Sequence, residues 1–174
     1  MAQEKRMKKD LRRELETIAM LQNPAWEYLK SSSLPLVLWG AGGGARSVKL
    51  LLDMQGITID FVVVDAPFYR PGEFFFDIPI SRWEDVQKCR QMNVVIAFIT
   101  QAAEKMTELR ALPEVGYCLM TDASSFKFDP DFMAQNHAAL ETLFHALSDD
   151  LSRQVFLAFL RAKNLHSAEE LLRW

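Results

Sequence analysis

The sequence predicts an α/β fold in which helices flank a parallel β-sheet. Short apolar runs alternate with segments of helical periodicity through the middle of the 174-residue chain, and one of these runs leads directly into a glycine-rich stretch at 40–44. Strands that alternate with helices form βαβ units with right-handed crossovers and parallel strands. With 49% hydrophobic residues, the chain can bury the core that such a sheet requires.

An N-terminal helical segment is expected at 1–30. Its apolar residues recur every three or four positions and so share one helix face; they are Met7, Leu11, Leu15 and Ile18. Basic and acidic residues are interspersed over the remaining surface, which favours a solvated helix over a patch for an anionic partner. The sequence "SSSLP" at 31–35 ends this segment and opens the next one.

The central domain is expected at 31–130. Its predicted strands cover 34–39, 59–64, 94–99 and 115–120, and its predicted helices cover 43–55, 83–91 and 102–112. Helices and strands alternate throughout this segment, so the predicted architecture is a Rossmann-like parallel sheet.

One further stretch of the central domain, "GEFFFDIPI" at 72–80, has strand-like alternation. Phe75 and Asp77 alternate with apolar residues, so a strand here would have one strongly apolar face, made up of Phe74, Phe76, Ile78 and Ile80. Two interpretations are open. The strand is either an exposed edge used in a homodimer or domain contact, or a strand covered by helices of the same chain.

A C-terminal helical connector is expected at 131–174. Its apolar residues form two helical stripes, which are Leu140, Leu143, Phe144 and Leu147, and Val155, Phe156, Phe159 and Leu160. Between them, the sequence "SDD" at 148–150 predicts a helix start, since its acidic residues suit the N-terminal end of the helix dipole.

Composition argues against several classes of protein. The formal net charge of −3 lacks the basic excess expected of a nucleic-acid binder. No apolar run approaches the ~20 residues of a membrane span, and the charged N-terminus does not resemble a signal peptide. Cys89 and Cys118 lie far apart without metal-ligand spacing. We therefore expect reduced cysteines, no structural metal and a cytoplasmic location.

The glycine-rich stretch fits the pattern G-x-G-x-x-G/A, with a predicted strand before it and a predicted helix after it. In that context Gly40 permits the tight turn, Gly42 lets a phosphate approach the backbone, and Ala45 lets the helix pack closely on the sheet. The helix N-terminus then offers N–H groups to an anion. Gly43 supports a ligand site, because glycine in a first helical turn is costly unless backbone approach is needed. The alternative is a turn retained for packing alone.

Other candidate ligand-binding residues follow the predicted strands. Asp65 ends the second strand, where a carboxylate accepts hydrogen bonds from ribose hydroxyls. Thr100 and Gln101 follow a later strand, and the sheet order places their loop opposite the glycine loop; Thr100 is equally well explained as a helix cap. Arg46 either reaches a phosphate or lies along the helix surface. The complete candidate set is Gly40, Ala41, Gly42, Gly43, Gly44, Ala45, Arg46, Asp65, Thr100 and Gln101.

No catalytic residue is assigned. His137, His145 and His166 all fall in the C-terminal helices, away from any strand end. The sequence has no Tyr-x-x-x-Lys pair, no G-x-S-x-G elbow, no HExxH motif and no lysine at the end of the glycine loop as in a P-loop. A complete dehydrogenase is therefore not expected.

The stretch "LVLWGAGGGARSVKLLLDMQGITIDFVVVD" resembles the start of the Rossmann-like domain of sugar-modifying proteins from bacterial surface polysaccharide pathways. The later "FDIPISRWEDV" looks like that group's G-I-P-V strand and helix. "LSDDLSRQVFLAFLRAKNL" is similar to the helical connector before the catalytic domain of FkbM-family methyltransferases. The resemblance implies a nucleotide-sugar or related ligand near Gly40, Gly42, Gly43, Gly44 and Asp65. The sequence "DAPFYRPGEFFFD" departs from the family's usual polar continuation.

The leading hypothesis is a non-catalytic, Rossmann-like domain that binds a nucleotide or a nucleotide-sugar. By the resemblance, it is the N-terminal part of a methyltransferase-like protein that acts on sugars, and its partners are a following catalytic domain or a second copy in a homodimer. A second hypothesis is a small NAD(P)-dependent oxidoreductase or epimerase-like enzyme. A third is a structural interaction module whose glycine loop is empty.

Overall fold

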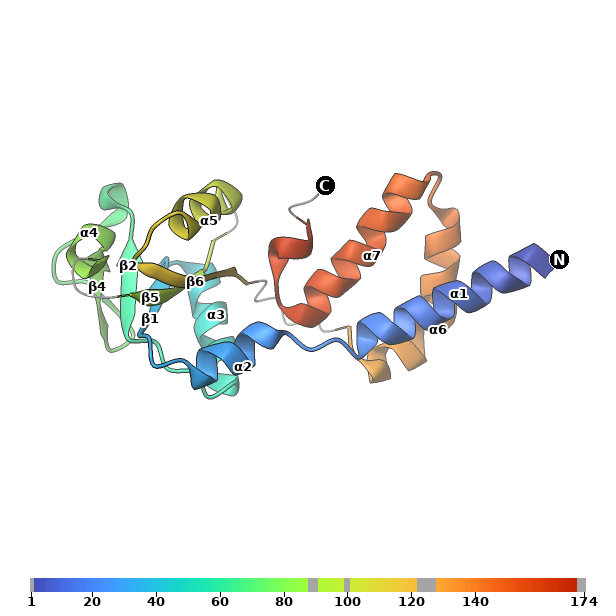
Figure 1. The fold of residues 1–174 in the computed structure, drawn as a ribbon, viewed down its shortest axis with the longest axis horizontal. Coiled ribbons are helices and arrows are strands. Elements are labelled where there is room, and N and C mark those ends of the chain that lie inside the picture. Colours follow the sequence, from blue (N-terminus) through green and yellow to red (C-terminus); the bar gives the residue numbers. More distant parts are fainter. Residues whose placement is uncertain (1, 88–90, 99–100, 122–127, 172–174) are drawn as a thin grey trace. The chain divides into compact units, whose positions relative to one another are not determined.

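The computed structural model describes residues 2–87, 91–98, 101–121 and 128–171, with side chains from residue 10 onward (Figure 1). The chain forms two compact units, each of which is described by itself. The sheet unit comprises residues 24–123, and the helical unit comprises residues 1–23 together with 124–174. The predicted α/β class, with a mostly parallel sheet, flanking helices and helices from both ends of the chain, is confirmed.

The sheet unit contains six strands in the order β3-β4-β2-β1-β5-β6. They are β1 (Leu36–Trp39), β2 (Phe61–Val64), β3 (Phe74–Phe75), β4 (Ile78–Arg82), β5 (Met92–Ile96) and β6 (Val115–Met120). Its helices are α2 (Pro24–Ser31), α3 (Gly43–Met54), the short η1 (Ala66–Phe68), α4 (Trp83–Val86) and α5 (Ala102–Arg110). All neighbouring strands are parallel except β3 and β4, which form an antiparallel hairpin.

The strand order fixes where a ligand can bind. From β1 the chain crosses to β2 on one side, and β5 later pairs with β1 on the other side. The order reverses at this point, so the loops after β1 and β5 leave the sheet in opposite directions and open a crevice at its carboxyl edge. The site of a Rossmann-like sheet is expected in this crevice.

Helices cover both faces of the sheet, because successive strand residues point to opposite sides. Leu38 shares a buried cluster with Leu52 of α3 on one face. On the other face, the ring of Trp39 lies 5.0 Å from that of Trp83 in α4, and Lys105 Nζ of α5 lies 4.8 Å from the Trp39 ring centroid. Figure 1 shows α3 and α5 on opposite sides of the strands.

The stretch 72–80 forms a hairpin, so its prediction as one strand with one apolar face was wrong. The chain reverses at Phe76 and Asp77, between β3 and β4, and Phe76 adopts a positive φ of 54°. The reversal buries Phe75 and leaves Phe74 and Phe76 exposed by 61% and 57%. Alternation in sequence predicts a shared face only where the strand continues.

Other element boundaries differ from the predictions. The helix expected at 83–91 ends at Val86, with residues 88–90 outside the described part of the chain, and β5 begins two residues earlier than expected. The helical segment expected at 1–30 consists of two helices, and the second, α2, belongs to the sheet unit. Pro24 stands at the first position of α2, where its missing N–H carries no penalty, and it cannot extend α1.

The helical unit joins both ends of the chain. Its elements are α1 (Ala2–Ala19), α6 (Pro130–Ala146), α7 (Asp150–Leu165) and the short η3 (Ala168–Leu171). Leu11, Leu15 and Ile18 of α1 pack in one buried cluster with Leu140 of α6 and Leu160 of α7. The predicted apolar face of α1 is therefore confirmed for these three residues, and α1 shares one core with helices of the segment expected at 131–174.

Side-chain amides tie the end of α1 to α7. Buried Asn164 Nδ2 donates hydrogen bonds to the backbone oxygens of Ile18 (2.8 Å), in the last turn of α1, and of Leu21 (2.7 Å), just after it. In return, Asn23 Nδ2 donates to the Leu165 oxygen at 2.7 Å. Because helix C-termini carry unpaired carbonyls, each of these side chains satisfies acceptors at the end of the other helix.

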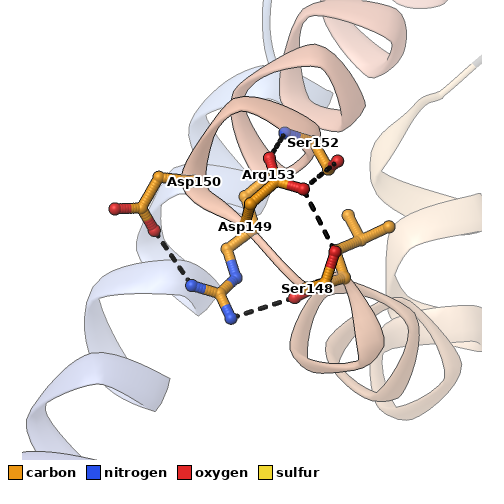
Figure 2. A network of polar contacts seen from close by, with 6 residues as sticks. Ser148, Asp149, Asp150, Ser152 and Arg153 are labelled. Carbon is orange, nitrogen blue, oxygen red and sulfur yellow. Dashed lines mark hydrogen bonds and ion pairs between the residues drawn. The ribbon is translucent and has the colours of Figure 1, made fainter.

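The start of α7 was predicted correctly (Figure 2). Asp149 is the N-cap, and its Oδ1 accepts a hydrogen bond of 2.7 Å from Ser152 N. Ser152 Oγ and Ser148 Oγ donate to the other oxygen at 2.8 and 3.1 Å. The backbone N–H of Ser152, followed by the serine hydroxyls, holds the pKa of Asp149 below its ordinary value. Among the described residues, no helix has the length and apolar character needed to cross a membrane.

Candidate functional site

The turn after β1 requires a glycine at its first position. Gly40 has φ of +116°, a conformation that L side chains rarely adopt, and its N–H donates to Val63 O at 2.8 Å. This bond holds the turn against the end of β2. The tight-turn role expected for Gly40 is thus the one its backbone shows.

The turn delivers the chain to an uncapped helix N-terminus. Gly42 is the N-cap of α3, with φ of −84°. Glycine has no side chain, so no side-chain hydrogen bond caps this helix end. Arg46 N donates to Gly42 O at 3.3 Å, so the N–H groups of Gly43, Gly44 and Ala45 have no acceptor within the helix. Together with the helix dipole, these N–H groups form the kind of end that binds an anion.

The three glycines at this helix start differ in their surroundings. A Cβ on Gly44 would lie 2.7 Å from the backbone oxygen of Ala97, which follows β5. A Cβ on Gly42 or on Gly43 would have nothing within 4 Å. Close packing of α3 on the sheet therefore depends on Gly44 as well as on the buried Ala45, whereas Gly42 and Gly43 leave open space in front of the backbone.

The Asp65 carboxylate lies at the carboxyl end of β2 and is held by two neighbours. Its Oδ2 accepts a hydrogen bond from Trp39 Nε1 at 3.4 Å, and its Oδ1 lies 3.3 Å from Lys105 Nζ. Burial works against the charge of Lys105, but the hydrogen bond with Glu108 and the attraction of Asp65 outweigh it and raise the pKa of Lys105. Asp65 therefore has its position fixed from both β1 and α5.

A cavity of about 510 Å³ lies among the carboxyl ends of β1, β2 and β5. Its lining residues are Trp39, Gly40, Ala41, Gly42, Val64, Asp65, Phe68, Glu73, Ile80, Phe98 and Gln101. Five of the ten candidate residues line this cavity, namely Gly40, Ala41, Gly42, Asp65 and Gln101. Phe98 and Gln101, which follow β5, thus line the same space as the glycine loop, at the crevice that the sheet order requires.

Gln101 has an unusual backbone for its residue type. It is the N-cap of α5, has φ of +59° and provides no side-chain cap. A non-glycine residue in the left-handed region carries a conformational cost, and such residues gather at binding sites. Thr100, the neighbouring candidate, lies outside the described residues.

The other candidates do not line the cavity. Gly43, Gly44 and Ala45 belong to the first turn of α3, beside it. Arg46 is exposed, and its guanidinium carbon lies 5.9 Å from the ring centroid of Phe76 in the β3–β4 turn. The Arg46 side chain thus faces the hairpin turn, and both alternatives for it stay predictions.

No family model, curated protein or solved structure matches this chain. The chemistry open to the site is therefore that of its own residues. Its lining contains two titratable side chains, those of Asp65 and Glu73, and both are carboxylates. His137 and His145 lie in α6 and His166 caps α7, all within the helical unit. Among the described residues, no group of three or more His, Cys, Asp and Glu side chains is placed to hold a metal ion.

Several residues that line the cavity are not among the candidates predicted from the sequence. Phe68, Glu73 and Ile80 come from the segment between β2 and the end of the hairpin, and Phe98 follows β5. The ring of Phe68 is 72% exposed although it borders a cavity. The available signal was the departure of "DAPFYRPGEFFFD" from the family's polar continuation, which placed aromatic and acidic residues directly after Asp65.

Proposed function

We propose that the sheet unit is a non-catalytic nucleotide-binding domain, whose ligand is a nucleotide or a nucleotide-sugar. One observation carries the proposal: a single cavity joins the glycine loop that leads into the uncapped N-terminus of α3 to the Asp65 carboxylate. These are the two groups that a nucleotide needs, because its phosphates seek backbone N–H groups and its ribose hydroxyls seek an acceptor.

The groups around the cavity support a ligand whose phosphates lie at the N-terminus of α3 and whose ribose lies at Asp65. Gly42 and Gly43 leave space in front of the helix N-terminus for phosphate oxygens. The Asp65 carboxylate has about four lone-pair sites and two protein partners, so it keeps capacity for a ribose diol. On the other side of the phosphates, Phe98 and Gln101 would face the sugar or second half of the ligand.

The same lining supports a binding role without catalysis. Proton transfer or nucleophilic attack requires an acid, a base or a nucleophile within reach of the ligand. Among the described lining residues there is no His, Cys, Ser, Lys or Tyr side chain, and the titratable groups are the carboxylates of Asp65, which contacts Trp39 and Lys105, and of Glu73. The resemblance to domains that precede FkbM-family methyltransferases supports a role in presenting a sugar compound to a separate catalytic domain.

A thermal-shift panel tests the proposal, with NAD, NADP, UDP- and GDP-sugars, S-adenosylmethionine and S-adenosylhomocysteine. A ligand at 100 times its dissociation constant adds about 2.7 kcal/mol to the free energy of unfolding, which raises the melting temperature by a few degrees. We expect such a shift with a nucleotide or nucleotide-sugar.

The variant Gly42→Asp separates binding from folding. Gly42 has an ordinary negative φ and open space at its Cβ, and aspartate is a favourable N-cap, so the variant is expected to fold at least as stably as wild type. Its carboxylate would occupy and repel the anion site, and the ligand shift should disappear. Ser47→Asp adds the same charge at an exposed position of α3 and should keep the shift. Equal shifts in wild type and Gly42→Asp, or none in wild type, would contradict the proposal.

A further inference from the structure

The short η1 helix places an aromatic ring beside the ribose-binding carboxylate. Phe68 N donates to Asp65 O at 2.8 Å, so one turn fixes Asp65 and Phe68 relative to each other. The ring lines the cavity and is 72% exposed, which is a costly position for a large apolar side chain in the absence of a partner. An exposed ring at this place offers a stacking surface to a nucleobase, whose faces are also apolar.

The β3–β4 hairpin adds a carboxylate to the same end of the cavity. Ile80 N donates to Glu73 O at 2.9 Å, which anchors Glu73 at the mouth of the hairpin, and the residue lines the cavity. Within the described part of the chain, no hydrogen bond or ion pair engages the Glu73 carboxylate. Unlike Asp65, Glu73 therefore presents both of its oxygens for a ligand.

The strand order places Phe68 and Glu73 at the end of the cavity where the nucleoside would lie. The strands β2 and β4 lie on the side of β1 away from β5. With phosphates at α3 and ribose at Asp65, the base extends toward β4 and thus toward Phe68 and Glu73. An ionised carboxylate has acceptors and no donors, so it selects a base edge with two adjacent N–H groups.

We propose that Glu73 and Phe68 read the base of the ligand, and that this base is guanine. Guanine presents N1–H and the N2 amino group side by side and matches both carboxylate oxygens. Adenine and cytosine each set one amino group beside a ring acceptor that a carboxylate repels, and the single N–H of uracil lies between two carbonyls. The ligand class is therefore a guanosine diphosphate compound. This inference rests on the proposed nucleotide-binding function.

Isothermal titration calorimetry of the full chain with GDP, ADP, UDP and CDP tests the assignment of guanine. For wild type we expect GDP to bind at least tenfold more tightly than the other three, as a lost bidentate contact implies. Glu73→Gln should weaken GDP at least tenfold and change UDP less than threefold. Phe68→Ala should weaken all four by a similar factor, because stacking tolerates any base.

The control is Glu84→Gln, which removes a carboxylate from an exposed position of α4 outside the cavity lining and should leave every affinity unchanged. Circular dichroism melting would establish that each variant is folded. Equal affinities for the four nucleotides, tighter binding of another one, or unchanged GDP affinity in Glu73→Gln would overturn the assignment of guanine and leave nucleotide binding standing. Absence of binding by all four would overturn both.

Discussion

Single residues in the glycine loop separate fold from function. Gly40 makes the turn, Gly44 lets α3 approach Ala97, and Gly42 and Gly43 face open space. A substitution in this loop thus acts on the stability of the sheet unit or on its ligand, according to position. Loss of binding in a glycine variant can be interpreted only when its stability is measured beside it.

Gly44→Ala tests the packing role. The added Cβ would meet a backbone oxygen at 2.7 Å, and neither backbone can move without disturbing α3 or the end of β5. We expect the free energy of unfolding to fall by about 1–3 kcal/mol. Gly43→Ala is the matched control, because its Cβ has open space and alanine favours the helix by roughly 0.5–1 kcal/mol. Urea denaturation measures both, and a Gly44→Ala variant as stable as wild type would refute the packing role.

Among the elements, α7 has the best-defined start. Asp149 receives one backbone N–H and two serine hydroxyls, and all three bonds require its carboxylate to accept. The next residue, Asp150, pairs with Arg153 at 3.0 Å, and Arg153 also donates to Leu147 O at the end of α6 (Figure 2). The turn between α6 and α7 is thereby held by polar contacts at both ends.

Replacing Asp149 by alanine should lower the melting temperature of the helical unit at neutral pH by a few degrees, since the N-cap is lost. The pKa of Asp149 is lowered by folding, so the stabilisation is fully present above its ordinary value of 3.8 and is lost as the pH falls through the folded value. The difference between wild type and Asp149→Ala, followed by circular dichroism from pH 7 to pH 2, should therefore shrink below about pH 4. A constant difference would contradict an ionised cap.

Local patterns predicted the elements whose signals lie within one segment. Helical spacing and Gly56 placed α3, β6 was placed at its observed bounds, and the acids at 148–150 marked α7. The hairpin was not predicted, because Phe76 and Asp77 turn the chain without the usual Asn-Gly or Asp-Gly pair and the alternation continues across the turn. Glu73 was missed for the same reason, since the hairpin brings it to the cavity end reached from Asp65. Phe68 was missed because the η1 turn that holds it beside Asp65 was not predicted.

At the scale of the whole molecule, the residues of the sheet unit lie in the sequence between the two parts of the helical unit. Its buried cluster contains residues of α2, α3 and the strands, and residues of α1, α6 and α7 form a separate cluster. No local sequence pattern predicts that α1 shares a core with α6 and α7. The expected division into three consecutive segments therefore differs from the two units of the structure.

Fragments of the chain test this organisation. Residues 24–123 alone should fold with a cooperative thermal transition, because their core is complete. Residues 124–174 alone should show little cooperative structure, since α1 supplies Leu11, Leu15 and Ile18 to their core. Adding a peptide of residues 1–23 should restore a cooperative transition, as seen by circular dichroism. A cooperative transition in 124–174 without that peptide would contradict the shared core.

The split of the helical unit also imposes a delay during synthesis. Residues 20–129, about 110 in all, separate α1 from α6, and translation at roughly 5–20 residues per second needs about 5–22 s for them. During this interval the apolar face of α1 has emerged from the ribosome and its packing partners have not. The nascent chain thus exposes the apolar face of α1 while the sheet unit forms behind it, and we expect a chaperone to bind this face during that interval.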